Sequence, residues 1–223
     1  MEKPGSAVPQ RLKVRKTPVQ TRSGATVEAI HEAAIQVLLA EGLTRLTTTR
    51  VAERAGVSVG TLYQYFPNKE ALLFALLQRH FEELASAMEG IGPDDAKQPL
   101  SILAEQIADT YVSVKIARPD ATAALYRVAG AIDQFRLPSD IYKRLEGSVL
   151  RILEKAGDAS FNRPEQAAFT LLSALAGLSR GSFGNLTAGT IDPDRFRSEA
   201  RMIATAYLTA AAQTKTKTVG DAQ

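Results

Sequence analysis

Apolar residues recur at steps of three and four along most of the chain, the spacing that places them on one face of an α-helix. The first such segment starts at Thr26, and Gly42 stands where a glycine commonly ends a helix. No segment alternates between apolar and polar residues with a period of two, and no fixed-period repeat is present. The pattern predicts an all-α fold of about nine helices.

The expected helices are separated by loops in which Gly, Pro, Asn and Asp gather. The clearest start signal is Asp192-Pro193, which combines a side-chain acceptor at the N-cap with proline at the first helical position. After the first helix, we expect helices at about 48–55, 59–66, 71–89, 100–117, a shorter stretch ending near 128, 139–156, 163–182 and 193–212.

Two short helices in residues 47–66 are the most informative part of the chain. Gly56 ends the first of them and can adopt the left-handed conformation that a tight turn requires. Ser58 can cap the second by accepting a hydrogen bond from an amide of its first turn. Small apolar residues of the first helix face Leu62 and Phe66 of the second. This arrangement predicts a helix-turn-helix.

The exposed face of the second helix has an unusual composition. With Leu62 directed inward, a rotation of about 100° per residue directs Gly60 and Gln64 outward, with Thr61 and Tyr63 beside them. None of these residues is charged, whereas an ordinary solvated helix face carries Lys and Glu. In a DNA major groove, Gln can read adenine, and Thr can contact thymine methyl groups or phosphates. The composition therefore indicates a DNA-reading helix.

Plainer structural roles exist for several of these residues. Tyr63 and Tyr65 are also compatible with packing at the edge of the domain, and Lys69 with a solvated position in the next helix. Thr47 and Thr48 are equally compatible with capping alone, which stabilises a helix by about 1 kcal/mol.

Composition narrows the function classes. The chain has 223 residues, 45% of them hydrophobic, which is ample for a sizeable core. The absence of cysteine excludes disulfides, thiolate metal sites and cysteine nucleophiles, and two histidines argue against a histidine-built metal site. No stretch approaches the roughly 20 apolar residues of a membrane span, and the N-terminus lacks the apolar core of a signal peptide. We expect a cytoplasmic protein without metal or cofactor.

The positive charge is concentrated at the N-terminus. The formal net charge is +3, but residues 1–23 alone hold six basic residues and one acidic residue. We interpret residues 1–22, which contain four Pro or Gly residues, as a flexible basic arm that contacts nucleic acid; a solvated tail is the alternative. Residues 23–70 then form the helix-turn-helix domain, and residues 71–223 form a second, larger helical domain.

The segment from Thr26 to about Leu73 resembles the DNA-binding domain of the TetR family of transcriptional regulators. The resemblance implies a homodimeric repressor whose two recognition helices enter successive major grooves of a near-palindromic operator. Such helices lie about 34–36 Å apart. The matching residues are Gly42, the Thr-rich helix start, Val51–Ser58, Gly60–Phe66 and Asn68–Leu73.

The resemblance also implies individual DNA contacts, carried over by position. Many family members have histidine where this chain has Tyr65, so a phosphate hydrogen bond is kept there but a charge is lost. The implied contacts are Thr47, Thr48 and Arg50 at the helix that meets the backbone, Ser58, Val59 and Gly60 at the start of the recognition helix, Thr61, Tyr63, Gln64 and Tyr65 along it, and the phosphate-contacting Lys69.

The second domain is expected to dimerise and to bind a small-molecule effector. Apolar residues surround the helix at 163–182 and form a stripe on the helix at 193–212, which fits an intersubunit four-helix bundle; an intramolecular core is the alternative. The middle helices are expected to enclose the effector site. Aromatic and polar residues within their apolar stretches are the candidates, although ordinary core or surface positions explain them as well. They are Tyr111, Arg118, Tyr126, Arg127, Phe135, Phe169, Arg180 and Phe183, and the three arginines favour an acidic or phosphorylated ligand.

The resemblance suggests that the effector shifts the long helix at about 69–89, which follows the recognition helix, and so changes the separation of the two DNA-reading helices. No fingerprint of a hydrolase, metalloprotease or nucleotide-binding enzyme is present, and His31 and His80 lack a paired nucleophile. We therefore expect no enzymatic activity. The alternatives are an activator, or a DNA-binding protein of this fold without an effector.

Overall fold

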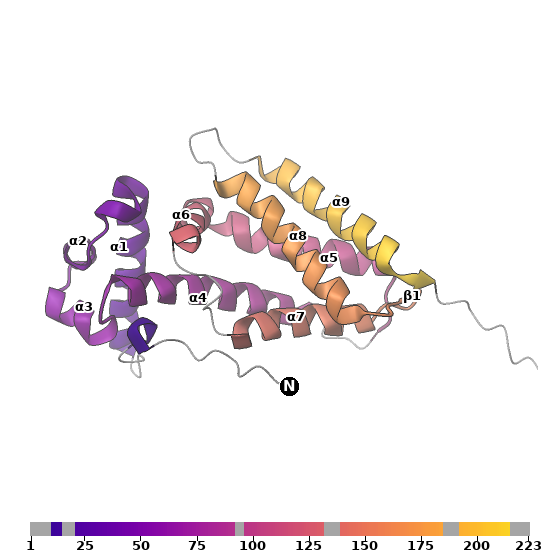
Figure 1. The fold of residues 1–223 in the computed structure, drawn as a ribbon, viewed down its shortest axis with the longest axis horizontal. Coiled ribbons are helices and arrows are strands. Elements are labelled where there is room, and N and C mark those ends of the chain that lie inside the picture. Colours follow the sequence, from indigo (N-terminus) through magenta and orange to yellow (C-terminus); the bar gives the residue numbers. More distant parts are fainter. Residues whose placement is uncertain (1–9, 15–20, 92–95, 132–138, 185–191, 215–223) are drawn as a thin grey trace, which may run out of the picture. The chain divides into compact units, whose positions relative to one another are not determined.

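The computed structural model describes residues 10–14, 21–91, 96–131, 139–184 and 192–214. Within these ranges the chain forms nine α-helices, one 3-10 helix and two strands of two residues each (Figure 1). The all-α prediction is confirmed. The two strands add a minimal antiparallel pair, β1 (Ala159–Ser160) with β2 (Gln213–Thr214), which is too short to show a period of two in the sequence.

Helix α1 covers Thr21–Arg45 and is kinked at Gly42, whose φ of +78° lies in the region that favours glycine. The predicted start at Thr26 was therefore five residues late. The chain also makes a further short turn beyond the predicted glycine end. In that turn the amide of Leu46 donates to the carbonyl of Gly42 over 3.2 Å.

The helix-turn-helix is confirmed and consists of α2 (Thr48–Ala55) and α3 (Val59–Tyr65). Thr47 caps α2 by accepting a hydrogen bond from the amide of Arg50 (3.3 Å). Ser58 caps α3 by accepting one from the amide of Thr61 (3.0 Å). Gly56 has a φ of +68°, as the predicted left-handed turn requires.

The other helices have bounds within three residues of those predicted. Asp192 caps the last of them by accepting hydrogen bonds from the amides of Asp194 and Arg195, each over 3.0 Å. These helices are α4 (Lys69–Glu89), α5 (Leu100–Ala117), α6 (Pro119–Ala131), α7 (Ser139–Glu154), α8 (Pro164–Gly184) and α9 (Pro193–Ala211).

The chain forms two compact units. The first contains α1 to α3, α4 as far as Glu83, α6 and the first residues of α7; the second contains the rest of α4, α5, the rest of α7, α8 and α9. The predicted boundary after residue 70 falls within α4. Helix α6, which was predicted in the second domain, packs on α1 in the first unit. The assignment of DNA and effector binding to these regions stays a prediction.

Each unit has its own interior. In the first, Ile30 of α1, Leu62 of α3 and Leu77 of α4 are fully buried in a common apolar cluster. In the second, α5 packs along α9, and α8 packs against α9 (Figure 1). Polar contacts reinforce that packing, because Asp109 of α5 accepts hydrogen bonds from Arg201 (2.6 and 2.7 Å) of α9, which hold the pKa of Asp109 below its usual value.

Two further properties concern the described ranges. None of their helices is long and apolar enough to cross a membrane. No three or more of their His, Asp or Glu side chains gather in a way that could hold a metal ion. Cysteine is absent from the whole sequence.

Candidate nucleic-acid interface

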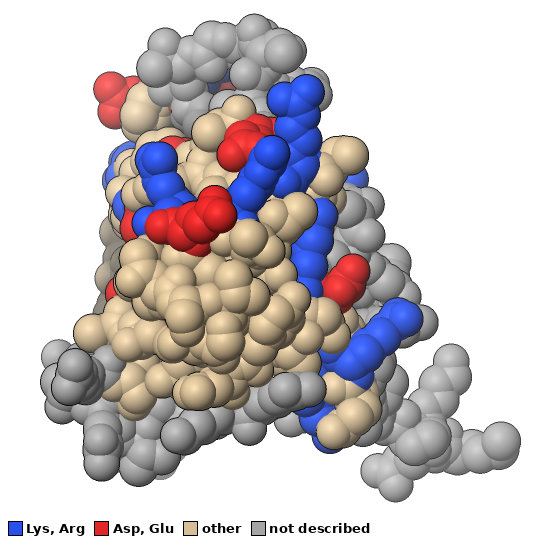
Figure 2. Space-filling model, turned by 90° about the vertical axis from the view of Figure 1, so that its left-hand side faces the viewer, with Lys and Arg blue, Asp and Glu red and all other residues tan. Residues whose placement is uncertain are grey.

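Helix α3 presents an uncharged face to the solvent. Figure 2 shows the side of the molecule that carries α2 and α3: side chains without charge occupy its centre, and Lys and Arg side chains lie at its margins together with Asp and Glu. This distribution suits duplex DNA, whose phosphates lie outside the groove that exposes the bases. Ser58, Gly60, Tyr63 and Gln64 are exposed on this face, and Val59 and Thr61 are half-buried.

A hydrogen bond joins the two helices of the motif. The hydroxyl oxygens of Tyr63 and Thr48 lie 3.0 Å apart. Thr48 is 9% exposed, whereas Tyr63 is 38% exposed. Since Thr48 opens α2 and Tyr63 lies in the middle of α3, this bond restricts the angle at which the helices cross. The sequence indicated a cap or a DNA contact for Thr48 and gave no sign of this partner.

Tyr65 does not lie on the exposed face. It is 7% exposed, and its ring centroid lies 6.4 Å from that of Phe66 in the core of the first unit. Tyr65 follows the buried Leu62 by three residues and so shares its side of α3, which agrees with the alternative of packing. The DNA contact predicted for Tyr65 stays a prediction.

Two arginines of α2 are bound to α1. Arg50 forms an ion pair with Glu41 and donates to the carbonyl of Arg45 (3.3 Å). Arg54 donates to the side-chain oxygen of Gln36 (2.8 Å). The Arg50 side chain remains 46% exposed, so it is both a link between helices and a cation available at the surface.

Lys69, the predicted phosphate contact, has an internal partner. Its ammonium donates to the carbonyl of Leu43 over 2.6 Å. The kink at Gly42 interrupts the helical hydrogen-bonding ladder near this carbonyl, and Lys69 supplies a donor there. An ammonium group has three donors, so this contact is compatible with binding a phosphate as well. The phosphate contact stays a prediction.

His31 of α1 packs against Phe66, the residue that caps the end of α3. Its ring centroid lies 5.4 Å from that of Phe66, and the residue is 8% exposed. Neither ring nitrogen has a hydrogen-bond partner within the described part of the chain. Burial and, to a smaller extent, the charge of Arg79 lower the pKa of His31 to about 4. The ring is therefore neutral at pH 7 and acts as a core residue.

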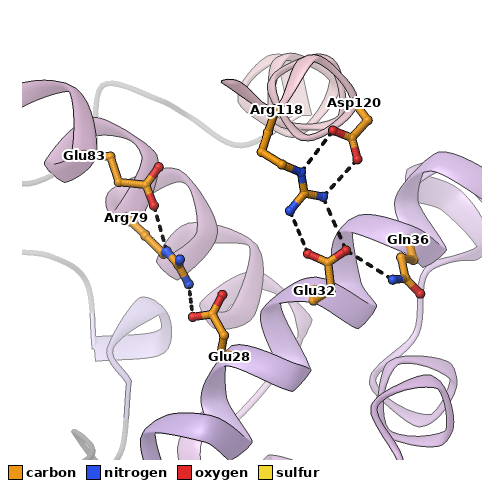
Figure 3. A network of polar contacts seen from close by, with 7 residues as sticks. All are labelled: Glu28, Glu32, Gln36, Arg79, Glu83, Arg118 and Asp120. Atoms are coloured by element: carbon orange, nitrogen blue, oxygen red, sulfur yellow. Dashed lines mark hydrogen bonds and ion pairs between the residues drawn. The ribbon is translucent and has the colours of Figure 1, made fainter. Parts of the chain in front are cut away.

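A chain of polar contacts leads from the start of α6 to Gln36 on α1 (Figure 3), and from Gln36 to Arg54 of α2. Arg118, between α5 and α6, donates to both carboxylate oxygens of Asp120 (2.9 and 3.2 Å) and of Glu32 on α1 (2.9 and 3.3 Å). Glu32 also accepts from the amide of Gln36 (3.1 Å), whose oxygen is the partner of Arg54. Hydrogen bonds from Arg118 lower the pKa of Glu32 and of Asp120.

A second ionic contact ties α4 to α1. Arg79 pairs with Glu28 of α1 and with Glu83 one turn along α4, the latter over 2.9 Å (Figure 3). The side chains of all these ion pairs are at least a third exposed, so each contributes about 0–1 kcal/mol. Their main effect is to connect three helices at defined positions.

The described candidates for the effector site fall in both units: Arg118 and Tyr126 in the first, and Tyr111, Phe169, Arg180 and Phe183 in the second. Arg118 lies in the surface ion pairs above, and Phe169 and Arg180 are exposed on α8. Phe183 is fully buried, with its ring 5.5 Å from that of Phe196. Of the others, Tyr111 is buried, Tyr126 is half-buried, and Phe135 and the side chain of Arg127 lie outside the described residues.

The effector-site residues predicted from the sequence include three arginines but not Lys115, a buried lysine of α5. Lys115 of α5 is 3% exposed, and its ammonium lies 5.4 Å from the ring centroid of Tyr111. Burial lowers the pKa of Lys115 to about 7. The signal was present, because Lys115 continues the three- and four-residue spacing of the buried positions Ile107 and Tyr111.

Helices α8 and α9 expose large apolar side chains. Phe169 on α8 is 61% exposed, and Met202 on α9 is 59% exposed. Side chains of this size at such exposure mark surfaces that bind another apolar surface when they lie in one patch. Phe169, a candidate for the effector site, is thus placed on the solvent side of α8 in the described chain.

Comparison with known proteins agrees with this architecture. Residues 30–76 match the model of the bacterial regulatory proteins of the tetR family, and residues 99–208 match that of the tetracyclin repressor-like C-terminal domain. The chain belongs to the TetR family. Members are DNA-binding transcriptional regulators and not enzymes, and the matched residues 30–76 include α2 and α3.

Several relatives are similar to this TetR-family chain. The uncharacterized HTH-type transcriptional regulator YvkB of Bacillus subtilis is 35% identical over 95 residues, which cover 41% of this chain and half of that protein. The nucleoid occlusion factor SlmA of Haemophilus ducreyi is 31% identical over 145 residues, 64% of this chain and 68% of that protein. The structure of SmeT, the repressor of the Stenotrophomonas maltophilia efflux pump SmeDEF, has the same fold, with a TM-score of 0.65 at 19% identity over 86% of this chain and 92% of SmeT.

Proposed function

We propose that this TetR-family regulator is a repressor that binds a near-palindromic operator as a homodimer and leaves it when a small-molecule effector binds. The uncharged face of α3, which carries exposed hydroxyl and amide groups, is the observation that carries the proposal. In this scheme residues 23–70 bind DNA, and residues 71–223 bind the effector and the second subunit.

The residues of the face have separate roles. Gln64 and Thr61 would contact base edges, and Gly60 would let the backbone of α3 approach the duplex. Thr47 and Arg50, at the start of α2, would contact phosphates and so fix the orientation of the domain. The contact between Tyr63 and Thr48 supports this model, because it holds α3 at a fixed angle to α2.

Dimerisation through α8 and α9 is favoured by their exposed apolar residues, Phe169 and Met202. Burial of an apolar side chain of this size contributes about 1.5–3 kcal/mol. A symmetric interface uses each residue twice, so even a small patch gives substantial stability. A dimer would also place two recognition helices on one face of the duplex.

The chain of contacts from Arg118 to Arg54 supports release by an effector. Arg118 directly follows Ala117, the last residue of α5, so a shift of α5 or α6 pulls on Glu32 and, through Gln36, on α2. A coupling of about 1–3 kcal/mol lowers operator affinity 5- to 150-fold. We propose this connection alongside the movement of α4.

Lys115 favours an acidic effector. Its ammonium is buried in the second unit beside Tyr111, where an anion would stabilise its charged form. The ring of Tyr111 and the cation of Lys115, both buried among apolar side chains, are suited to a ligand with an apolar body and one acidic group.

The test is selection of bound sequences from random DNA, followed by binding assays on the recovered site. The proposal requires an inverted repeat with half-sites one helical turn, about 34–36 Å, apart and a protein dimer on each site. Recovery of no preferred sequence, or of a site bound by one protomer, contradicts it. Transcription from a promoter that contains the site, measured with and without the protein, separates repression from activation.

A role without an effector is the second candidate, because one relative carries the name nucleoid occlusion factor. The same operator complex separates the two candidates. Release of DNA by an acidic small molecule supports the effector-responsive repressor, whereas DNA binding unaffected by a broad metabolite panel favours the second candidate.

A further inference from the structure

Residues Gln10–Val14, called the arm root here, lie against the first unit. Gln10–Leu12 form a 3-10 helix, and Leu12 is 4% exposed within the apolar cluster that also contains Phe66. The neighbouring Arg11 and Lys13 are exposed. One buried leucine therefore attaches a segment whose two charges stay in the solvent.

Asn68 connects the arm root to the start of α4. Its Nδ2 donates to the carbonyl of Arg11 (2.9 Å), and its Oδ1 accepts from the amide of Ala71 (2.7 Å). The amide of Ala71 can only donate and the carbonyl of Arg11 can only accept, so these two partners determine the orientation of the side chain. Asn68 thus caps α4 and holds the arm root with the same group.

This attachment places positive charge at the end of the recognition helix. Asn68 follows Phe66, the cap of α3, by two residues and directly precedes Lys69. In the sequence, residues 1–9 contain one lysine and one glutamate and no other charged side chain, so the basic excess of the N-terminus begins at Arg11. The basic excess of the N-terminus therefore begins in the arm root, which is attached to the first unit by the buried Leu12 and by the hydrogen bond from Asn68.

We propose that the arm root is a second DNA-contacting element of this protein. Arg11 and Lys13 bind the sugar-phosphate backbone of duplex DNA beside the end of α3, and Leu12 and Asn68 are positioning residues that keep these cations in register with it. The inference rests on the proposed function, since it requires that the first unit binds DNA. The contact recognises charge and carries no sequence preference of its own.

The test is the salt dependence of binding to a random-sequence duplex of about 30 base pairs, measured by fluorescence anisotropy over a series of KCl concentrations. Each phosphate contact contributes about −0.9 to the slope of log affinity against log salt. The double variant Arg11→Gln/Lys13→Gln should therefore reduce the slope by about 1.8 and weaken binding roughly tenfold at low salt. Deletion of residues 2–9, which removes no net charge, is the matched control and should leave both values unchanged.

A second variant tests the positioning role. Asn68→Ser keeps an oxygen that can cap α4 but lacks the amide that reaches Arg11. We expect an unchanged thermal melting curve and base preference, with affinity between those of the wild type and the double variant. Hydroxyl-radical footprinting on the selected operator should show protection lost at its flanks and kept at its centre.

The outcomes separate the two proposals. If the wild type binds neither random duplex nor any selected site, the proposed function fails. If the wild type binds DNA while the double variant keeps its slope and affinity, the arm root has no such role and the proposed function stands. A loss of slope on deletion of residues 2–9 as large as in the double variant places the contact before the arm root and also overturns the inference.

Discussion

The exposed surfaces of α3 and of α8 with α9 depart from an ordinary solvated helix in opposite ways. Helix α3 exposes the polar residues Tyr63 and Gln64, whereas α8 and α9 expose Phe169 and Met202. Hydrogen-bonding groups already have water as a partner, so they favour only a surface with matching donors and acceptors. Apolar side chains favour any surface that excludes water. Under the proposed function, α3 is the surface that selects a DNA sequence, and α8 with α9 is the surface that stabilises the dimer.

We expect the largest effect from introducing charges into the exposed apolar surface of α8 and α9. In the variant Phe169→Glu/Met202→Glu, a dimer should dissociate, because four apolar side chains are lost and charges replace them, a cost on the order of 5 kcal/mol or more. Sedimentation velocity at micromolar concentration should show a monomer, and operator affinity should fall with it. Ile102→Glu on α5, where the wild-type residue is 44% exposed, is the control and should stay dimeric. A double variant that remains a dimer contradicts the assignment.

The next expected effect is a pH dependence of stability. It concerns α3 and not α8 or α9, because the buried His31 packs against Phe66 at the end of α3. The pKa of His31 is about 4 in the folded protein against 6.5 ordinarily, so the unfolded chain binds the additional proton between these values. Stability contributed by neutral His31 is complete above pH 6.5 and falls by about 3 kcal/mol as the pH drops towards 4. Urea unfolding at pH 7 and pH 4.5 measures this loss, and His31→Leu should reduce it. Equal losses in both proteins would refute the role of His31.

A moderate effect tests whether the α3 surface reads bases. Gln64→Ala should cost about 1–3 kcal/mol on the preferred operator and relax base preference at one position. Gln166→Ala, at an exposed glutamine of α8, removes the same side chain from the other surface and should change neither value. Anisotropy titrations on operator variants compare the two proteins. A Gln64→Ala protein with wild-type base preference would exclude Gln64 from recognition.

The smallest effect concerns the bond that orients α3. Tyr63→Phe removes the hydroxyl that lies 3.0 Å from that of Thr48 and should cost about 1 kcal/mol of unfolding free energy. Thr48→Val removes the other hydroxyl. If the two groups interact, the double variant costs less than the sum of the single variants, as chemical denaturation can measure. Strict additivity would show that the contact contributes nothing to stability.

Local features were predicted well from the sequence. Gly56, Ser58 and Asp192 act within a few residues of themselves, where backbone geometry and capping chemistry suffice to assign them. The recognition helix was therefore assigned to within one residue. Its outward residues followed from helical rotation, whereas the burial of Tyr65 was not predicted, although Tyr65 lies about one turn from the buried Leu62.

Contacts between distant segments could not be predicted. Lys69 was assigned a phosphate, but its ammonium also binds the carbonyl of Leu43, 26 residues away, which becomes accessible only at the Gly42 kink. Arg118 was assigned to an effector site, and the structure shows that it binds Glu32, 86 residues away. Side chains of this length have many partners in reach, and the choice depends on the packing of the whole unit.

The exposure of the polar contacts in Figure 3 makes their strength depend on the salt concentration. The side chains of Arg118 and Glu32 are 50% and 39% exposed, so mobile ions screen their attraction. Mobile ions also weaken the binding of phosphates by exposed cations. A rise in salt concentration would therefore weaken DNA binding and, at the same time, the contact between Arg118 and Glu32 that we propose to couple the effector to α2. Such a regulator would respond to the ionic strength of its surroundings as well as to its proposed ligand.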